Sequence, residues 1–415
     1  MVRGAAWIAC AAVVAAAQCR APRESRADRD PTTRWDAWLE SPGGPLHFGL
    51  ELTREPAPAA TLVNGAERLA VPEVELDARG AWVLRIPYYD STVRARPDGG
   101  GLVGSWTKVA GPDRRTTMVL RATPARRDEP PAPHDAPGEA VAGRWRVDFS
   151  EADAPAVGVF EAGTGDRVSG TFLTELGDYR FLAGRFDGEA LTLSCFDGAH
   201  AFLFTAALAA DGALHGDFWS RDSWHETWTA HRDPEARLAD PFGLSTWTDA
   251  MPLGELAFPD TSGRLRALDD PAFAGRARVI QLFGTWCPNC NDEAPFLAEL
   301  DRRWRDRGLS ILGLAFELTG DFERDARQVR RYAEHHGIEY PILVAGLADK
   351  QEASRRFPLL DRVRAFPTTI FLDGRGHARA VHTGFAGPAT GAEYQRLRAD
   401  FERLIEQLLT TEDER

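Results

Sequence analysis

Two cysteines separated by two residues stand at the boundary between a predicted strand and a predicted helix. They lie in the segment Trp-Cys-Pro-Asn-Cys at residues 286–290. Cysteines at this spacing can close a small disulfide, and the unpaired N–H groups at a helix start favour the thiolate of the first one. The thiolate of Cys287 could therefore attack a substrate disulfide, and Cys290 would resolve the mixed disulfide that forms. The segment predicts thiol–disulfide exchange.

The same pair could instead bind zinc. A zinc site of this type requires a second pair of cysteines or histidines at ligand spacing, and no such pair occurs in the sequence. We therefore expect no metal and no separate cofactor. The redox group is expected to be the disulfide between Cys287 and Cys290.

Strands and amphipathic helices alternate around this segment, from about residue 251 to residue 415. The hydrophobic periodicity predicts strands at 278–283, 309–315, 340–344, 368–372 and 378–382, and helices at 288–307, 321–336, 348–357 and 391–409. This alternation predicts an α/β fold with a mixed sheet, in which the cysteine pair lies where a buried strand meets a helix.

A second motif follows the cysteine pair along the chain. A proline seldom opens a strand unless its missing N–H is not needed for pairing, yet Phe-Pro-Thr at 366–368 does so here. An Asp-Gly turn at 373–374 ends that strand. Taken in order with the cysteine segment, these features resemble the thioredoxin superfamily across residues 251–415.

Within that superfamily, Pro288 and the long insertion at 311–344 are similar to the TlpA/ResA-type envelope disulfide reductases. The resemblance implies that Pro367 is cis and faces the cysteine pair. It also implies that the backbone of Phe366 pairs with an extended segment of the substrate. We assign Trp286 and Pro288, which flank the first cysteine, to the same substrate-binding surface.

One carboxyl group could carry the proton of the second cysteine. Thioredoxins place a buried aspartate six residues before the first cysteine, and Gln281 occupies that position here. Glu293 lies one helical turn after Cys290 and matches the acidic residue of ResA-type reductases. If it is buried, its pKa should rise and it could shuttle that proton; if it is exposed, it is an ordinary first-turn glutamate. Glu317, at the end of a predicted strand, is a weaker candidate.

The N-terminus has the features of an export signal. One basic residue precedes a short apolar run with small residues near its end, so residues 1–19 are predicted to be a signal peptide and 20–33 a tether. Ala-Ala-Gln-Cys at 16–19 resembles a bacterial lipobox, in which Cys19 would carry a lipid anchor. Cleavage after Ala-Ala-Ala at 15–17, which would release a soluble protein, is the alternative.

The region between the tether and the α/β domain is rich in short strands. Alternating patterns and glycine turns predict one β-rich unit at 34–125 and a second at 141–232, or two halves of one β domain. Proline-bearing segments at 126–140 and 233–250 are predicted linkers. Cys195 falls on the apolar face of a predicted strand and is expected to be an inert buried thiol.

Length and charge agree with this organisation. A chain of 415 residues is too long for one ordinary core, and a net charge of −13 argues against a nucleic-acid partner. The predicted fold class is multidomain, with an N-terminal β-rich, barrel- or sandwich-like region followed by a C-terminal α/β thioredoxin fold.

These observations predict a protein-disulfide oxidoreductase of the bacterial envelope. Its substrates would be protein thiols and disulfides, and a membrane partner would supply electrons. The resemblance favours reduction, including tasks such as apocytochrome c maturation, although the reduction potential decides the direction. The alternative is a lipid-anchored client-binding protein in which the β region binds a partner and the thioredoxin module is secondary.

Overall fold

The computed structural model describes residue 1 and residues 32–125 and 137–411. The predicted signal peptide with Cys19, nearly all of the tether and most of the first linker therefore lie outside the described residues. The part from Thr32 onward forms one compact unit. None of the described helices is long and apolar enough to cross a membrane.

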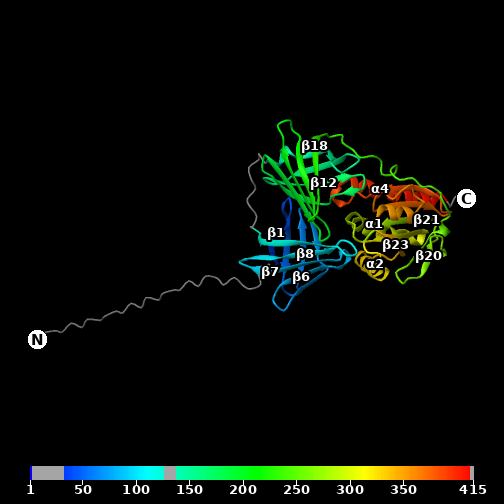
Figure 1. The fold of residues 1–415 in the computed structure, drawn as a ribbon, viewed down its shortest axis with the longest axis horizontal. Coiled ribbons are helices and arrows are strands. Elements are labelled where there is room, and N and C mark those ends of the chain that lie inside the picture. Colours follow the sequence, from blue (N-terminus) through cyan, green and yellow to red (C-terminus); the bar gives the residue numbers. More distant parts are fainter. Residues whose placement is uncertain (2–31, 126–136, 412–415) are drawn as a thin grey trace. The chain divides into compact units, whose positions relative to one another are not determined.

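The first β unit is a nine-stranded antiparallel sheet whose strands alternate buried and exposed side chains. Figure 1 draws this unit in blue and cyan. Its order is β4-β3-β2-β1-β9-β8-β7-β6-β5, so the first strand pairs with the last. The strands are β1 (Thr32–Ser41), β2 (Gly44–Thr53), β3 (Ala59–Asn64), β4 (Glu67–Ala70), β5 (Glu73–Leu76), β6 (Trp82–Ile86), β7 (Ser91–Asp98), β8 (Gly101–Val109) and β9 (Arg115–Pro124). A short 3-10 turn, η1 (Pro87–Tyr89), joins β6 to β7.

The second β unit is also nine-stranded, and it closes into a barrel because β11 pairs with both β10 and β12. Its first strand again pairs with its last. The strands are β10 (Gly143–Phe149), β11 (Ala156–Ala162), β12 (Arg167–Thr174), β13 (Gly177–Asp178), β14 (Leu182–Phe186), β15 (Ala190–Phe196), β16 (Ala201–Leu208), β17 (Leu214–Ser220) and β18 (Trp224–Arg232). Cys195 lies fully buried in its core, and burial raises the pKa of that thiol well above its ordinary value.

Glycines allow the barrel strands to bend closely past one another. A Cβ built on Gly184 would lie 1.8 Å from the Thr192 carbonyl oxygen, and one on Gly216 would lie 1.9 Å from that of Thr205. No side chain fits at either position, so the curvature of the barrel depends on these residues.

The C-terminal domain has a five-stranded mixed sheet of order β23-β22-β21-β24-β25. The three strands β21 (Ala277–Phe283), β22 (Leu309–Glu317) and β23 (Ile342–Leu347) are parallel, whereas β24 (Thr368–Asp373) and β25 (Ala378–Thr383) run antiparallel to their neighbours. The helices are α1 (Pro288–Trp304), α2 (Phe322–His336), α3 (Lys350–Arg356) and α4 (Ala392–Thr411), and a hairpin of β19 (Ala257–Pro259) and β20 (Leu265–Ala267) precedes them. The predicted fold class, a β-rich region followed by a thioredoxin fold with a mixed sheet, is confirmed.

Residues 233–250 contain no extended strand or helix, and they pack on the C-terminal domain. The Thr383 amide donates to the Pro241 carbonyl, and Trp247 forms an isolated bridge with Leu360. This segment is therefore held in place against the domain that it precedes.

Candidate active site

The cysteine pair lies where the buried strand β21 gives way to α1. Cys287 caps the helix, and its Sγ accepts a hydrogen bond of 3.3 Å from the backbone N–H of Cys290. Because that N–H is one of the donors left free at a helix start, it stabilises negative charge on the sulfur. Cys287 thus lies at the start of α1 with its sulfur in contact with a helix-start N–H.

Cys290 lies deeper than Cys287. Its side chain is fully buried, and burial together with the hydrogen bond to Cys287 raises the pKa of its thiol well above the ordinary value. The Tyr332 hydroxyl donates a 2.7 Å hydrogen bond to the Cys290 carbonyl and fixes this turn of the helix. Burial therefore favours the protonated form of Cys290.

The strand that carries the proline motif meets the first cysteine. The Phe366–Pro367 peptide is cis, as the resemblance implied. Cys287 Sγ donates a 3.2 Å hydrogen bond to the Phe366 carbonyl, so this backbone lies directly beside the thiol. Trp286 packs edge-on to Phe366 at 5.8 Å between ring centroids and donates to the Phe316 carbonyl at 2.9 Å. Four of the predicted residues thus converge on one spot.

Glu293 is completely buried beneath the pair. Its Oε1 accepts a 2.6 Å hydrogen bond from the Thr369 hydroxyl, and its Oε2 accepts one of 2.5 Å from the Gln281 side chain. Burial raises the pKa of this carboxyl to about 7, against the smaller opposing effect of the two hydrogen bonds. A carboxyl with that pKa can take up and release a proton near neutral pH.

A second buried carboxyl, Glu317, supports the loop that leads into the motif. Its two oxygens accept hydrogen bonds from the backbone N–H and the hydroxyl of Thr285, at 2.9 and 2.8 Å. Burial raises its pKa to about 8. Its contacts are those of a residue that positions the loop before Trp286.

Sequence reasoning missed a set of contacts that the barrel makes with the motif itself. The Asn289 amide donates to Asp178 Oδ2 at 3.2 Å, and Arg180 reaches the Pro288 carbonyl at 3.5 Å and Asp292 Oδ2 at 2.8 Å. No local pattern could have found these contacts, because they join residues 108 to 112 positions apart.

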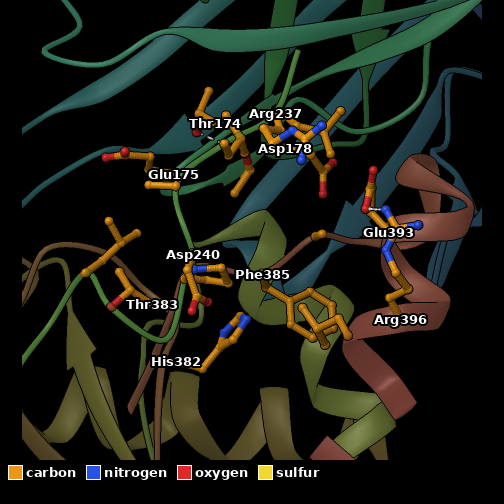
Figure 2. Close-up of a pocket in the computed structure, with 18 of the residues that line it drawn as sticks. Thr174, Glu175, Asp178, Arg237, Asp240, His382, Thr383, Phe385, Glu393 and Arg396 are labelled. Atoms are coloured by element: carbon orange, nitrogen blue, oxygen red, sulfur yellow. Dashed lines mark hydrogen bonds and ion pairs between the residues drawn. The ribbon is translucent and has the colours of Figure 1, made fainter. Parts of the chain in front are cut away.

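A cavity of about 700 Å³ lies beside this junction (Figure 2). Its walls come from the barrel residues around Asp178, the segment 234–244, the end of β25 and the start of α4. Figure 2 shows the ring of His382 directed toward the cavity from below. The ring Nδ1 has no hydrogen-bond partner in the described part of the chain, and burial lowers the pKa of His382 to about 4.

Comparisons with known proteins match the C-terminal part of the chain. Residues 249–381 match the model of the AhpC/TSA family. Thioredoxin-like protein YneN of Bacillus subtilis (strain 168) is 28% identical over 123 residues, which are 30% of this chain and 64% of that protein. Thiol-disulfide oxidoreductase ResA of Geobacillus thermodenitrificans (strain NG80-2) is 26% identical over 132 residues, 31% of this chain and 66% of that protein.

Among solved structures, a thiol:disulfide interchange protein of the thioredoxin family from Chlorobium tepidum TLS is 25% identical. The match covers 39% of this chain and 99% of that one, with a TM-score of 0.29. The chain spans just under two thirds of the length of YneN and ResA.

Proposed function

We propose that this chain, whose C-terminal domain is a thioredoxin-like domain of the AhpC/TSA family and of the thiol-disulfide oxidoreductase type, reduces disulfide bonds in proteins. The Cys287 thiolate attacks one sulfur of a substrate disulfide, and the other substrate sulfur leaves as a thiolate. Cys290 then loses its proton and attacks Cys287 Sγ. The second substrate thiolate is released, and the enzyme is left with the Cys287–Cys290 disulfide.

The observation that carries this proposal is the environment of Cys287 Sγ. One helix-start N–H points at the sulfur, and the Phe366 carbonyl next to the cis proline lies 3.2 Å away. The first contact stabilises the attacking thiolate, and the second places the backbone that would pair with an extended substrate segment beside it.

Glu293 completes the reaction as a proton carrier. Since the pKa of Cys290 is raised by burial, its proton must pass to a base before it can attack. Glu293 lies one helical turn away, with a pKa near neutrality. We assign it that proton and assign Trp286 and Pro288 to the walls of the substrate site.

The cellular setting is proposed on the predicted signal peptide and the likeness to ResA. We place the protein on the outer side of the bacterial inner membrane, tethered through a lipid on Cys19. Its partners would be protein thiols, such as those of apocytochrome c, and a membrane protein that resupplies electrons. The pair itself is the redox group, with no metal or other cofactor.

The rival proposal is a client-binding protein in which the thioredoxin module is secondary. The contacts of Asp178 and Arg180 with the motif favour the enzyme, because they join the β region to the reactive thiols. Full-length Cys290→Ser would test the choice, with Cys287→Ser as its matched control. The enzyme predicts that Cys290→Ser accumulates mixed disulfides with a reporter protein and that Cys287→Ser forms none. If both variants act on their clients like the wild type, the client-binding proposal holds.

A further inference from the structure

The β region lies directly over the cysteine motif. Gly177 packs so closely on Asn289 that an added Cβ would lie 2.4 Å from the Asn289 Oδ1 atom. The hydrogen bond from Asn289 to Asp178 and that from Arg180 to the Pro288 carbonyl engage both residues between the cysteines. A substrate that approached this face would meet the barrel first.

Asp178 organises this contact. Its Oδ2 accepts hydrogen bonds from the Gly387 N–H at 2.6 Å and from Asn289 at 3.2 Å, and its Oδ1 accepts one from the Arg180 N–H at 2.7 Å. One buried carboxylate at the end of β13 therefore links the barrel to the first turn of α1 and to the loop at Gly387. Removing it would leave three donors without this partner.

Arg180 could separate from the motif without becoming an unpaired buried charge. Its guanidinium pairs with Glu67 at 2.5 Å and with Asp197 at 3.2 Å, both in the β region, and with Asp292 of α1 at 2.8 Å. Only the third pair crosses to the thioredoxin-like domain. If the two parts moved apart, Arg180 would keep two carboxylate partners, which lowers the cost of opening.

A second contact fastens the β region on the other side of the motif. The side-chain amide of Gln328 in α2 donates to the carbonyls of Pro87 and Tyr88 in η1, at 2.9 and 2.7 Å. The Tyr88 ring stacks on His335, with 3.8 Å between ring centroids. The β region thus touches both helices next to the thiols.

These contacts leave little room at the sulfur. Cys287 is 3% exposed and Phe366 is 7% exposed. The interface is nevertheless not tightly packed, because the cavity of Figure 2 lies between the barrel and the thioredoxin-like domain. An interface with such a void gains less dispersion energy than a close-packed core, so a few polar contacts hold much of it together.

We infer that the β region is a cover over the Cys287–Cys290 motif, held by Asp178 and Arg180 on one side and by Gln328 and η1 on the other, and that it selects substrates by size. Small disulfides reach Cys287 with little opening, whereas disulfides in folded proteins react after these contacts break and the cover moves away from the motif. The inference rests on the proposed function and makes the β region the specificity determinant of that same site.

The test compares the alkylation rates of reduced Cys287 by N-ethylmaleimide and by a maleimide carrying a long polyethylene glycol chain. Both cysteines of the motif fall on one proteolytic peptide, so fragmentation mass spectrometry on the digested full chain locates each adduct and gives the rate at Cys287 separately from Cys290 and Cys195. The variants are Asp178→Ala and Gln328→Ala. The matched control for Asp178→Ala is Asp187→Ala, which removes an exposed carboxylate that accepts hydrogen bonds from two backbone N–H groups in another barrel turn. The matched control for Gln328→Ala is Gln351→Ala, which removes an exposed glutamine on α3.

The quantity compared is the alkylation rate with the bulky maleimide divided by the rate with N-ethylmaleimide. In the wild type this ratio should be at least about tenfold lower than the same ratio for a free cysteine peptide. Loss of the contacts in either variant should speed the bulky reagent about tenfold or more and the small one much less, since each variant loses two hydrogen bonds across the interface and one such bond shifts an opening equilibrium by up to about that factor. The two controls should behave like the wild type.

Equal relative rates for the two reagents in the wild type would overturn the inference. So would unchanged rates in both variants while circular dichroism shows them folded. Alkylation requires only a thiol, so this outcome is independent of whether the pair is a working redox couple. If the cysteine pair showed no reversible redox couple but alkylation of Cys287 still depended on the size of the reagent, the proposed function would be rejected and the inference about the β region would stand.

Discussion

The Thr369 hydroxyl donates a 2.6 Å hydrogen bond to Glu293, and this contact joins the strand after the cis proline to the helix that carries both cysteines. The carboxyl is buried and has no cationic partner among the described residues, and this burial raises its pKa to about 7. A single side chain therefore links the strand after the cis proline to the helix that Cys287 caps.

Replacing Glu293 by glutamine should slow the resolution step. In the wild type the rate should rise with pH through about 7, because the ionised carboxylate then accepts the Cys290 proton. Glu293→Gln should lose that inflection and react about 100-fold more slowly at neutral pH, the usual effect of removing a general base. Stopped-flow measurement of mixed-disulfide resolution across pH gives both values.

The control for that experiment is Glu323→Gln, which changes an exposed glutamate in the first turn of α2. It should keep the wild-type profile. An inflection near pH 7 that survives in Glu293→Gln would assign the proton transfer to another group, with Glu317 the next candidate because its pKa is raised to about 8.

The same residue should make stability depend on pH. The carboxyl titrates near 4.5 in the unfolded chain and at about 7 when folded, so the unfolded state loses its proton first. Below pH 4.5 the carboxyl is protonated in both the folded and the unfolded state, so it does not change the free energy of unfolding. Between pH 4.5 and 7 the free energy of unfolding falls as the pH rises, and above pH 7 this effect stays constant. Because each pKa unit corresponds to about 1.4 kcal/mol, Glu293→Gln should gain about 3 kcal/mol over the wild type between pH 4.5 and 8.

Gln281 can accommodate that glutamine, since its unpaired Oε1 can turn to accept the new amide N–H. Denaturant unfolding of both proteins at several pH values measures the difference. A difference in free energy of unfolding that stays constant from pH 4.5 to 8 would mean that Glu293 does not titrate in this range.

The barrel should not tolerate a methyl group at its bends. Gly184→Ala would place a Cβ 1.8 Å from the Thr192 carbonyl oxygen of the paired strand. Because the clash is with backbone, the strands must separate, and the melting temperature should fall by an amount equivalent to about 3 kcal/mol or more. Calorimetry checks this, with Gly111→Ala as the control, where an added Cβ would lie 3.7 Å from the Arg114 Cβ, an ordinary van der Waals contact. Equal melting temperatures would show that the barrel can relax around the methyl group.

The sequence was most informative where a motif and a periodic element coincide. The cysteine pair at a strand–helix junction and the Phe-Pro opening of β24 predicted the thioredoxin-like fold and which residues meet there. The burial of Glu293 could be stated only as a condition, because helix position three after Cys290 does not say what packs against it. The structure supplies the missing partners, Thr369 and Gln281.

The contacts of the β region with the cysteine motif could not be predicted from the sequence, and the reason is different. Short alternating strands predicted a β-rich region, but they do not encode which loop meets which domain. Asp178 ends the short strand β13, Arg180 follows it before β14, and only tertiary contacts bring them to Asn289 and Asp292. Long-range polar contacts of this kind leave no periodic signal in the chain.

The reduction potential of the Cys287–Cys290 pair tests the central claim most directly. The full-length protein would be equilibrated in a series of thiol–disulfide buffers, and the fraction of oxidised pair would be trapped and counted by mass. The account predicts a reversible two-electron couple at about −270 mV or below, the range of thioredoxin-type reductants. A couple near about −120 mV would reverse the proposed direction, and the absence of any reversible couple would contradict the redox function itself.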